Sequence, residues 1–230
     1  MNQKRFWFLN RVELFSGLSL EDAARIEGMS EVVKVRRRHV IFTPGDSSDK
    51  IYMLKSGLVK ISRVTQEGKE LTLHFLSAGD VFGEGALIDK APRNTLASAY
   101  EDCVLQSIDR ESALQFMATN TDFILKLTQL IADRRRKLEN KIDNLLFKSA
   151  HARLAGLFLE LSDEFGVRDS RGVIINLKLT HREIANLIGS TRETVSFALL
   201  DLRKDKLIQN DGKRVILLDI PGIKKLHDGR

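Results

Sequence analysis

The spacing of apolar residues near the C-terminal end of the chain predicts two short helices joined by a tight turn. Thr180 and Glu183 have the spacing of a capping box before the first helix. Gly189 suits a left-handed turn after it, and either Ser190 or Thr191 suits the cap of the second helix. The two apolar sets, each on one helix face, are Ile184, Ala185, Leu187 and Ile188, then Val195, Ala198, Leu199 and Leu202. This pattern predicts a helix-turn-helix.

The opposite side of the second predicted helix carries polar and charged residues. Arg192 and Glu193 lie near its N-terminus, the end that usually enters the major groove of DNA. Arginine can donate twice to guanine, glutamate can accept from cytosine, and an exposed Phe197 can contact a thymine methyl. Two alternatives stay open: a helical hairpin with a solvated charged face, and a Phe197 that belongs to the core. The predicted DNA-binding residues are Thr180, Arg182, Ser190, Thr191, Arg192, Glu193, Ser196, Phe197 and Lys213.

A hairpin is predicted directly after these helices. Asp211-Gly212 is a signal for a two-residue turn, and the Val-Ile-Leu-Leu run from Val215 has the character of a strand. We expect this hairpin to form the wing of a winged helix-turn-helix.

From Val32 to Ile108 the apolar pattern changes to short alternating or apolar runs separated by glycine. The spacings between the turn glycines are 12, 11 and 11 residues, at Gly45, Gly57, Gly68 and Gly79. This rhythm is typical of short antiparallel strands joined by turns, so we predict a β-roll or jelly-roll barrel. A short helix is predicted before it over residues 18–29, with Ser19 as N-cap and Asp22 as its capping partner.

Within this region, Gly83-Glu84-Gly85 leads from a predicted strand into one helical turn. Backbone N–H groups at such a place form an anion site, and the glycines allow an anion to approach the chain closely. Arg93 follows across a short loop. Together these residues can hold a phosphate while Glu84 accepts from a ribose hydroxyl. The alternative is an ordinary loop with a solvated arginine.

Residues 121–148 form a long helical pattern without glycine or proline. Apolar residues repeat every seven positions, which is the layout of a coiled-coil seam, so we predict that the chain dimerises through this helix. The predicted dimerisation residues are Thr128, Ile131, Arg135, Leu138, Ile142 and Leu145. The basic run from Arg134 to Lys137 is either a solvated face or includes an arginine that turns toward a ligand.

Composition adds a charge preference and several expected absences. The 230-residue chain has a net charge of +6, which suits an anionic partner. One cysteine, Cys103, excludes an intrachain disulfide and a cysteine-rich metal site, so we expect a reducing cytoplasm and no metal. Cys103 is either a buried strand thiol or a redox sensor. No apolar run is long enough for a signal peptide or a membrane span, and no catalytic constellation emerges, so we expect neither a membrane partner nor an enzyme.

The glycine-punctuated barrel, the Phe82-Gly83-Glu84 segment with Arg93, the long helix and THREIANLIGSTRETVSFAL from Thr180 together resemble the Crp/Fnr family, over about residues 14–218. The resemblance implies an α+β fold. Its parts are a cyclic-nucleotide-binding-type β-roll over 1–120, a dimerisation helix over 121–148 and a winged helix-turn-helix over 149–230. It also implies a homodimeric bacterial transcription factor that binds palindromic double-stranded operators and acts on RNA polymerase.

The resemblance also assigns ligand roles residue by residue. Gly83, Glu84 and Arg93 match the family's phosphate and ribose contacts, and Arg134 matches the helix arginine that reaches the nucleotide. Two changes concern the rest of the pocket: Asn94 replaces a serine, with Thr95 as a substitute hydroxyl, and Leu138 and Glu139 replace the hydroxyl residues that recognise adenine. The predicted ligand-binding residues are Gly83, Glu84, Gly85, Arg93, Asn94, Thr95, Arg134 and Leu138.

These changes leave the effector open. We expect either a ligand other than cyclic AMP, such as another cyclic nucleotide or a cyclic dinucleotide, or constitutive DNA binding; true cyclic-AMP dependence is the alternative. The family's iron–sulfur and haem branches need ligands that are absent here, so His74 is an ordinary strand residue. Arg192 and Glu193 match the family's base contacts and Phe197 replaces its third arginine. The operator is therefore expected to resemble the TGTGA half-site with one contact changed.

Overall fold

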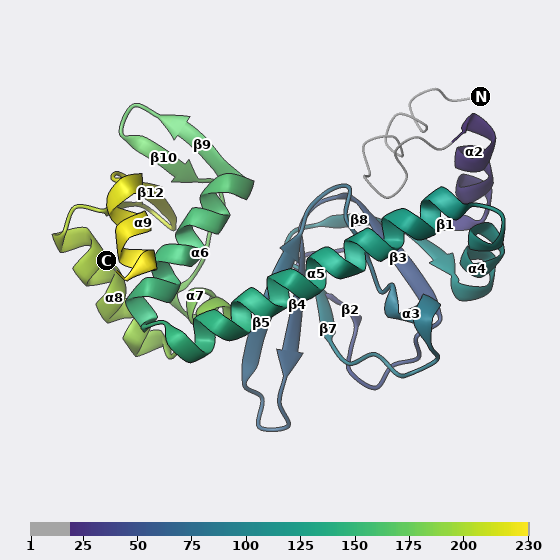
Figure 1. Cartoon of the computed structure of the whole chain (residues 1–230), viewed down its shortest axis with the longest axis horizontal. Helices are drawn as coiled ribbons and strands as arrows, with labels where there is room; N and C mark the ends of the chain where they lie inside the picture. The colour runs from purple at the N-terminus through teal and green to yellow at the C-terminus, as the bar shows by residue number, and fades with distance from the viewer. Residues whose placement is uncertain (1–18, 230) are drawn as a thin grey trace. The chain divides into compact units, whose positions relative to one another are not determined.

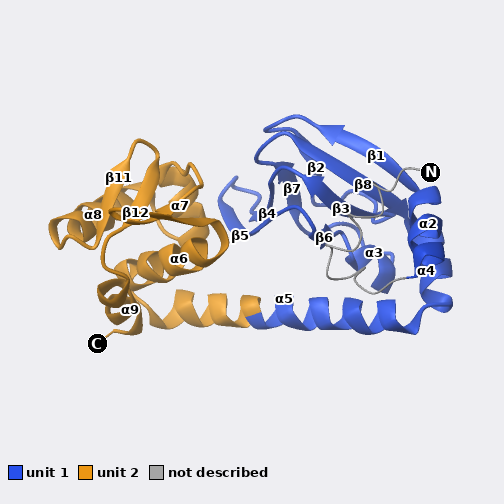
Figure 2. Cartoon of the chain, turned by 90° about the horizontal axis from the view of Figure 1, so that it is seen from above, with its two compact units in different colours: residues 1–136 blue, residues 137–230 orange. Residues whose placement is uncertain are grey.

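The computed structural model describes residues 19–229 and divides the chain into two compact units, 1–136 and 137–230 (Figure 2). The division falls within the long helix α5 (Thr121–Phe147), so the predicted boundaries at 120 and 148 remain predictions. The expectation that the N-terminal segment is not a signal peptide concerns residues outside the described range. Within that range, no helix is long and apolar enough to cross a membrane.

The first unit contains two antiparallel four-stranded sheets (Figure 1). In spatial order, one sheet contains β1 (Ser30–Val35), β8 (Cys103–Asp109), β3 (Lys50–Ser56) and β6 (Val81–Phe82); the other contains β2 (Val40–Phe42), β7 (Leu96–Ala99), β4 (Val59–Val64) and β5 (Glu70–Leu76). Each predicted turn glycine lies between two strands. Gly57 shows the reason: its φ is 91°, and a Cβ there would lie 2.3 Å from the carbonyl oxygen of Asp102.

Two apolar clusters hold the first unit together. One joins the two sheets and includes Phe42, Val59, Phe82 and Leu105. The other covers the opposite face of the first sheet and joins it to four helices: α2 (Leu20–Gly28), α3 (Gly85–Ile88), α4 (Arg110–Ala118) and the start of α5. The sheet is therefore buried on both faces, and the roll is anchored to the long helix.

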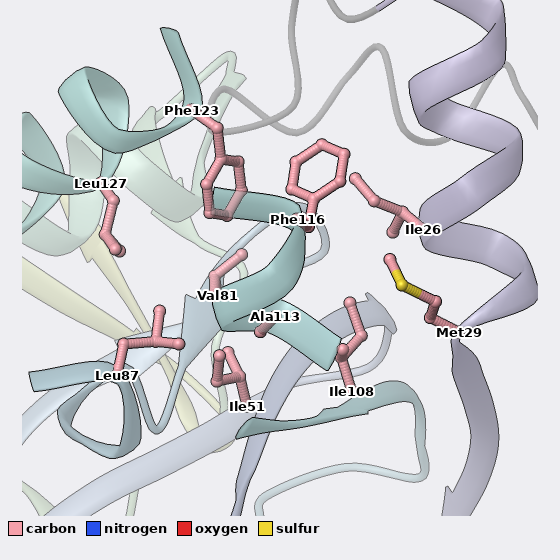
Figure 3. A pocket seen from close by; sticks show the side chains of 10 residues that line it. All are labelled: Ile26, Met29, Ile51, Val81, Leu87, Ile108, Ala113, Phe116, Phe123 and Leu127. Atoms are coloured by element: carbon pink, nitrogen blue, oxygen red, sulfur yellow. The ribbon is translucent and has the colours of Figure 1, made fainter. Parts of the chain in front are cut away.

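The second cluster encloses a small cavity of about 20 Å³ (Figure 3). Only apolar residues line it, among them Val81 from the sheet, Phe116 from α4 and Phe123 from α5. A cavity of this size holds no more than a water-sized molecule, and its apolar walls offer water no hydrogen bond. It is a packing feature and not a ligand site.

Caps fix where the helices of the first unit begin. Ser19 Oγ accepts from the Asp22 N–H at 3.0 Å, which confirms the predicted cap of the N-terminal helix. The Asp109 carboxylate caps α4 by accepting from the Ser112 N–H at 2.9 Å, and it is the end of β8 that delivers this residue. The strand-to-helix corner that positions α4 and α5 is thus specified locally.

The second unit contains four helices and one antiparallel sheet beyond the end of α5. The helices are α6 (Ala150–Phe165), α7 (His181–Ile188), α8 (Arg192–Lys204) and α9 (Ile220–Asp228). The sheet order is β11 (Ile208–Asp211), β12 (Arg214–Leu217), β10 (Gly172–Ile175) and β9 (Gly166–Asp169). The architecture is the predicted α+β arrangement of a β-roll, a long helix and a winged helix-turn-helix.

Candidate functional site

The helix-turn-helix is built by local signals. Thr180 Oγ1 accepts from the Glu183 N–H at 3.2 Å, and Glu183 Oε2 accepts from the Thr180 N–H at 2.6 Å, so the capping box is confirmed. Helix α7 ends at Gly189, whose φ of 60° and ψ of 52° are the predicted left-handed conformation. Of the two predicted caps, Thr191 starts α8 by accepting from the Thr194 N–H at 3.2 Å. Two helices are thereby joined by a rigid turn.

The second of these helices buries one side and exposes the other. Val195, Ala198, Leu199 and Leu202 are buried, as predicted. Arg192 and Glu193 are exposed in the first turn, and Phe197 is 68 % exposed, which settles it as a surface residue. A large aromatic ring that stays in water beside a charged pair is consistent with a contact surface.

The structure brings some of the predicted DNA-binding residues to one groove of about 590 Å³. Thr180 and Arg182 line it from the start of α7, Arg192 from the start of α8, and Lys213 from the hairpin. Arg214 adds a fourth cation that the sequence did not single out, and no Asp or Glu belongs to the lining. An uncompensated cluster of cations at two helix N-termini favours an anion. Ser190, Thr191, Glu193, Ser196 and Phe197 do not line this groove.

Ser196 differs from its neighbours because its hydroxyl is already engaged. Its Oγ donates to the Arg192 carbonyl at 2.9 Å and lies 2.8 Å from His181 Nδ1. His181 also lines the groove, yet sequence reasoning missed it. The pairing joins residues 15 positions apart on two helices, so only the helix packing could show it.

The predicted hairpin forms, with its turn one residue later than expected. Asp211 pairs with Arg214, so the turn consists of Gly212 and Lys213, not Asp211 and Gly212. Gly212 has a φ of 61°, which suits the first central position of a type II′ turn. A second hairpin, β9–β10, pairs with β12 through β10 and was not predicted. Its residues are largely exposed or half-buried, so they lack a strong strand pattern.

In the first unit, the Gly83–Gly85 segment makes the predicted strand-to-helix turn, and its acidic residue is paired inside the chain. Glu84 Oε1 lies 2.6 Å from Arg134 Nη1, and both side chains are about four-fifths buried. Arg134 also donates to the Val81 carbonyl. The β6–α3 turn is thus tied to α5 by a charge-assisted bond that needs no ligand.

Arg93 is also engaged by the chain itself. Its Nη1 donates to the Gly83 carbonyl at 2.9 Å, its Nη2 donates to the Lys50 carbonyl, and the guanidinium lies 4.5 Å from the ring centre of Phe42. Its side chain is buried, and Nε has no partner among the described residues. Burial lowers the pKa of the Arg93 guanidinium from its ordinary value, against the opposing effect of Tyr52 and nearby carboxylates.

The other predicted ligand residues are less enclosed. Asn94 is exposed and its backbone carbonyl accepts from Arg63 at 2.7 Å, while Thr95 is half-buried. Leu138 is 46 % exposed and belongs to the second unit. The structure therefore joins Gly83, Glu84, Arg93 and Arg134 into one network of contacts and leaves Asn94 and Thr95 outside it.

Apolar side chains are exposed along the second half of α5. Ile142 is 47 % exposed, Leu146 is 69 % exposed and Phe147 is 80 % exposed, whereas Ile131 packs against the apolar cluster of the first unit. The other predicted seam positions do not follow this division: Thr128 and Arg135 are exposed, and Leu145 is half-buried. An apolar stripe of this extent on a long helix is typical of a surface that another chain covers.

The remaining sequence candidates have structural explanations. The thiol of Cys103 is buried, its Sγ lies 3.3 Å from the Leu58 carbonyl oxygen and 3.2 Å from the Glu101 carbonyl oxygen, and burial raises its pKa. This environment favours the inert strand thiol over a redox sensor. His74 lies on β5, as the sequence suggested. Within residues 19–229, no group of three or more His, Cys, Asp or Glu side chains is placed to hold a metal.

Comparison with known proteins assigns both units. The family of the cyclic nucleotide-binding domain matches residues 32–120, and the family of the Crp-like helix-turn-helix domain matches residues 152–226. A CRP-like cAMP-activated global transcriptional regulator of Mycobacterium tuberculosis is 31% identical over 211 residues, which cover 92% of this chain and 94% of that protein. The chain belongs to the Crp/Fnr family of transcriptional regulators.

Two further similarities bear on this Crp/Fnr regulator. The global nitrogen regulator of a Nostoc species is 35% identical over 181 residues, with 78% of this chain and 81% of that protein covered. The solved structure of a c-di-GMP-responsive regulator from Xanthomonas campestris has a TM-score of 0.79 at 24% identity, covering 87% and 100% of the two chains. That likeness concerns the fold alone. The family consists of DNA-binding regulators and not of enzymes, which agrees with the expectation from the sequence.

Proposed function

We propose that this chain is a cytoplasmic homodimer that binds palindromic double-stranded DNA operators and acts on RNA polymerase. The exposed start of α8 carries this proposal: Arg192, Glu193 and Phe197 lie in water at the end of the helix that a helix-turn-helix inserts into the major groove. The cationic groove beside it supplies the sequence-independent part of DNA binding. Selection of operators from random DNA with the purified protein tests the proposal.

Single substitutions separate base reading from phosphate binding. Arg192→Ala is expected to cost about 1–3 kcal/mol and to relax preference at one base pair, because a bidentate arginine contact carries that preference. Lys213→Ala is the matched control, since the loss of a phosphate contact weakens binding to all sequences alike. If Arg192→Ala left the selected sequence and its discrimination unchanged, α8 would not be the reading helix.

The exposed apolar stripe of α5 supports a homodimer. Ile142→Glu places a charge among the exposed apolar residues and is expected to weaken the dimer at least about tenfold, which corresponds to about 1.4 kcal/mol. Asn140→Glu adds the same charge at an exposed polar position of the same helix and is expected to leave the dimer intact. Sedimentation equilibrium measures both. Equal behaviour of the two variants, or a monomeric wild-type protein, would contradict dimerisation through this surface.

We further propose that operator binding does not require cyclic AMP. The support is that the side chains predicted to bind phosphate and ribose are bonded to other groups of the protein. Glu84 pairs with Arg134, and Arg93 donates to two backbone carbonyls and packs on Phe42. A nucleotide that uses the Glu84 carboxylate or the two bonded Nη–H groups of Arg93 competes with these contacts, whereas Arg93 Nε has no partner among the described residues. Constitutive binding is therefore favoured over gating by a different cyclic nucleotide or a cyclic dinucleotide.

Calorimetry of the purified protein with cyclic AMP, cyclic GMP and cyclic di-GMP, beside operator binding with and without each, separates these cases. We expect operator binding of the same strength in all four conditions. Tight binding of cyclic GMP or cyclic di-GMP that raises operator affinity favours a gated regulator, and the same result with cyclic AMP overturns the proposal. Transcription in vitro from a promoter that carries the selected operator tests the action on RNA polymerase.

A further inference from the structure

His181, the first residue of α7, is linked to the start of the reading helix by two consecutive hydrogen bonds. Its Nδ1 lies 2.8 Å from Ser196 Oγ, and Ser196 Oγ donates to the Arg192 carbonyl at 2.9 Å. A hydroxyl has one proton, and here that proton is directed at the Arg192 carbonyl. Nδ1 must therefore be the donor to Ser196, which fixes the orientation of the ring and places the proton of a neutral imidazole on Nδ1.

This arrangement leaves Nε2 as the ring atom that determines the charge of His181. Nε2 has no hydrogen-bond partner among the described residues. His181 lines the groove of about 590 Å³ described above, half-buried at its wall. A second proton can reach the ring only at Nε2, where it creates both a cation and a hydrogen-bond donor without disturbing the bond to Ser196.

The charged residues around His181 come from three segments and are mostly basic. The start of α7 contributes Arg182 and Glu183, and the Glu183 carboxylate is already occupied by the capping box with Thr180. The start of α8 contributes Arg192 and Glu193, and the hairpin contributes Lys213 and Arg214. Four cations and no carboxylate line the groove, which therefore attracts an anion.

We propose that His181 is a proton-linked contact to the DNA backbone. A phosphate in the groove neutralises the surrounding arginines and lysine, favours the protonated ring and accepts a hydrogen bond from Nε2. DNA binding then takes up a proton at His181, and operator affinity rises as the pH falls. This inference rests on the proposed function, because it assumes that the groove receives a DNA phosphate.

The test is operator affinity as a function of pH. Fluorescence anisotropy with a labelled selected operator, at constant ionic strength from about pH 5.5 to about pH 8.5, covers the range in which histidine changes charge. For uptake of one proton, the wild-type dissociation constant is expected to rise by up to about tenfold per protomer for each unit of rising pH. His181→Gln keeps a side-chain N–H for Ser196 and cannot take up the proton, so most of this slope is expected to disappear.

The matched control is His151→Gln in the same unit. His151 Nε2 lies 3.0 Å from Asp201 and His151 does not line the groove, so this variant is expected to keep the wild-type slope. NMR titration of the His181 ring in the wild-type protein is a second measurement that needs no variant. Added operator is expected to shift the midpoint of the ring's titration to higher pH.

The possible outcomes distinguish this inference from the proposed function. If the wild-type protein binds operator and His181→Gln has the same pH slope, or if DNA leaves the ring titration unchanged, His181 is not proton-linked. If the wild-type protein binds no duplex at any pH, the proposed function fails and the inference fails with it. Loss of the slope in His181→Gln alone, with the ring shift in the wild type, supports both.

Discussion

Replacement of Gly189 by alanine is expected to destabilise the second unit through backbone conformation alone. Gly189 ends α7 with φ 60° and ψ 52°, and its N–H donates to the Ala185 carbonyl. The residue is exposed and lies outside the buried core. The cost therefore comes from the left-handed conformation and not from packing.

The magnitude follows from two opposing effects. A Cβ in the left-handed region costs about 1–2 kcal/mol. Alanine also restricts the unfolded chain, which returns about 0.4–1 kcal/mol. The expected net loss in the free energy of unfolding of the second unit is thus about 1 kcal/mol. Gly189→Asn is expected to lose less than Gly189→Ala, because asparagine enters this region more readily than other side chains.

Native-state hydrogen exchange at the amides of α7 and α8 measures this loss within the full chain. Gly28→Ala is the control and is expected to raise stability. Gly28 ends α2 without a positive φ, and a Cβ there meets nothing within 4 Å. Alanine is the better helix residue at such a position by about 0.5–1 kcal/mol. Equal protection in Gly189→Ala and wild type, or an equal loss in the alanine and asparagine variants, would refute the conformational explanation.

Three further predictions concern other parts of the chain. Burial raises the pKa of the Cys103 thiol, so at pH ~8 the native protein should react with iodoacetamide at least about tenfold more slowly than the urea-unfolded protein, as measured by mass spectrometry; equal rates would contradict the buried thiol. Above the ordinary thiol pKa of 9.0 the unfolded chain loses this proton before the folded chain does, so the free energy of unfolding falls as the pH rises. Phe116 is 2 % exposed and packs edge-on against Phe123 beside the small apolar cavity (Figure 3). Phe116→Ala should therefore lower the free energy of unfolding of the first unit by about 3–5 kcal/mol in urea titrations, and a loss below about 1 kcal/mol would mean that the site is not close-packed. Lys206 has a φ of 56°, so Lys206→Gly should raise the stability of the second unit by about 0.5–1 kcal/mol in hydrogen exchange, and a loss would show that the lysine side chain contributes more than its backbone strain.

The sequence predicted best those features that depend on residues close together in the chain. The capping box of Thr180 and Glu183, the turn at Gly189 and the apolar face of α8 each arise within one or two helical turns. The glycine-marked turns of the β-roll are local in the same sense. Such features follow from backbone preference and periodicity, which the surrounding fold reinforces but does not create.

The sequence was less accurate where strand pairing decides the outcome. The wing turn lies at Gly212-Lys213 because Asp211 pairs with Arg214, and a one-residue shift of this kind depends on which side chains the partner strand buries. The β9–β10 hairpin escaped prediction because its first strand is mostly exposed and its pairing partner, β12, lies about forty residues away.

By itself, therefore, the sequence determined that this chain is a β-roll followed by a long helix and a winged helix-turn-helix, with Arg192 and Glu193 on the outer face of the reading helix. Only the tertiary structure showed that Glu84 pairs with Arg134 and that Ser196 holds His181 at the wall of a cationic groove. The Glu84–Arg134 pair and the Ser196–His181 contact could not be predicted for the same physical reason. A charge or a hydrogen-bond donor can be recognised from its residue type, but the group that satisfies it depends on which distant segments the fold places within reach.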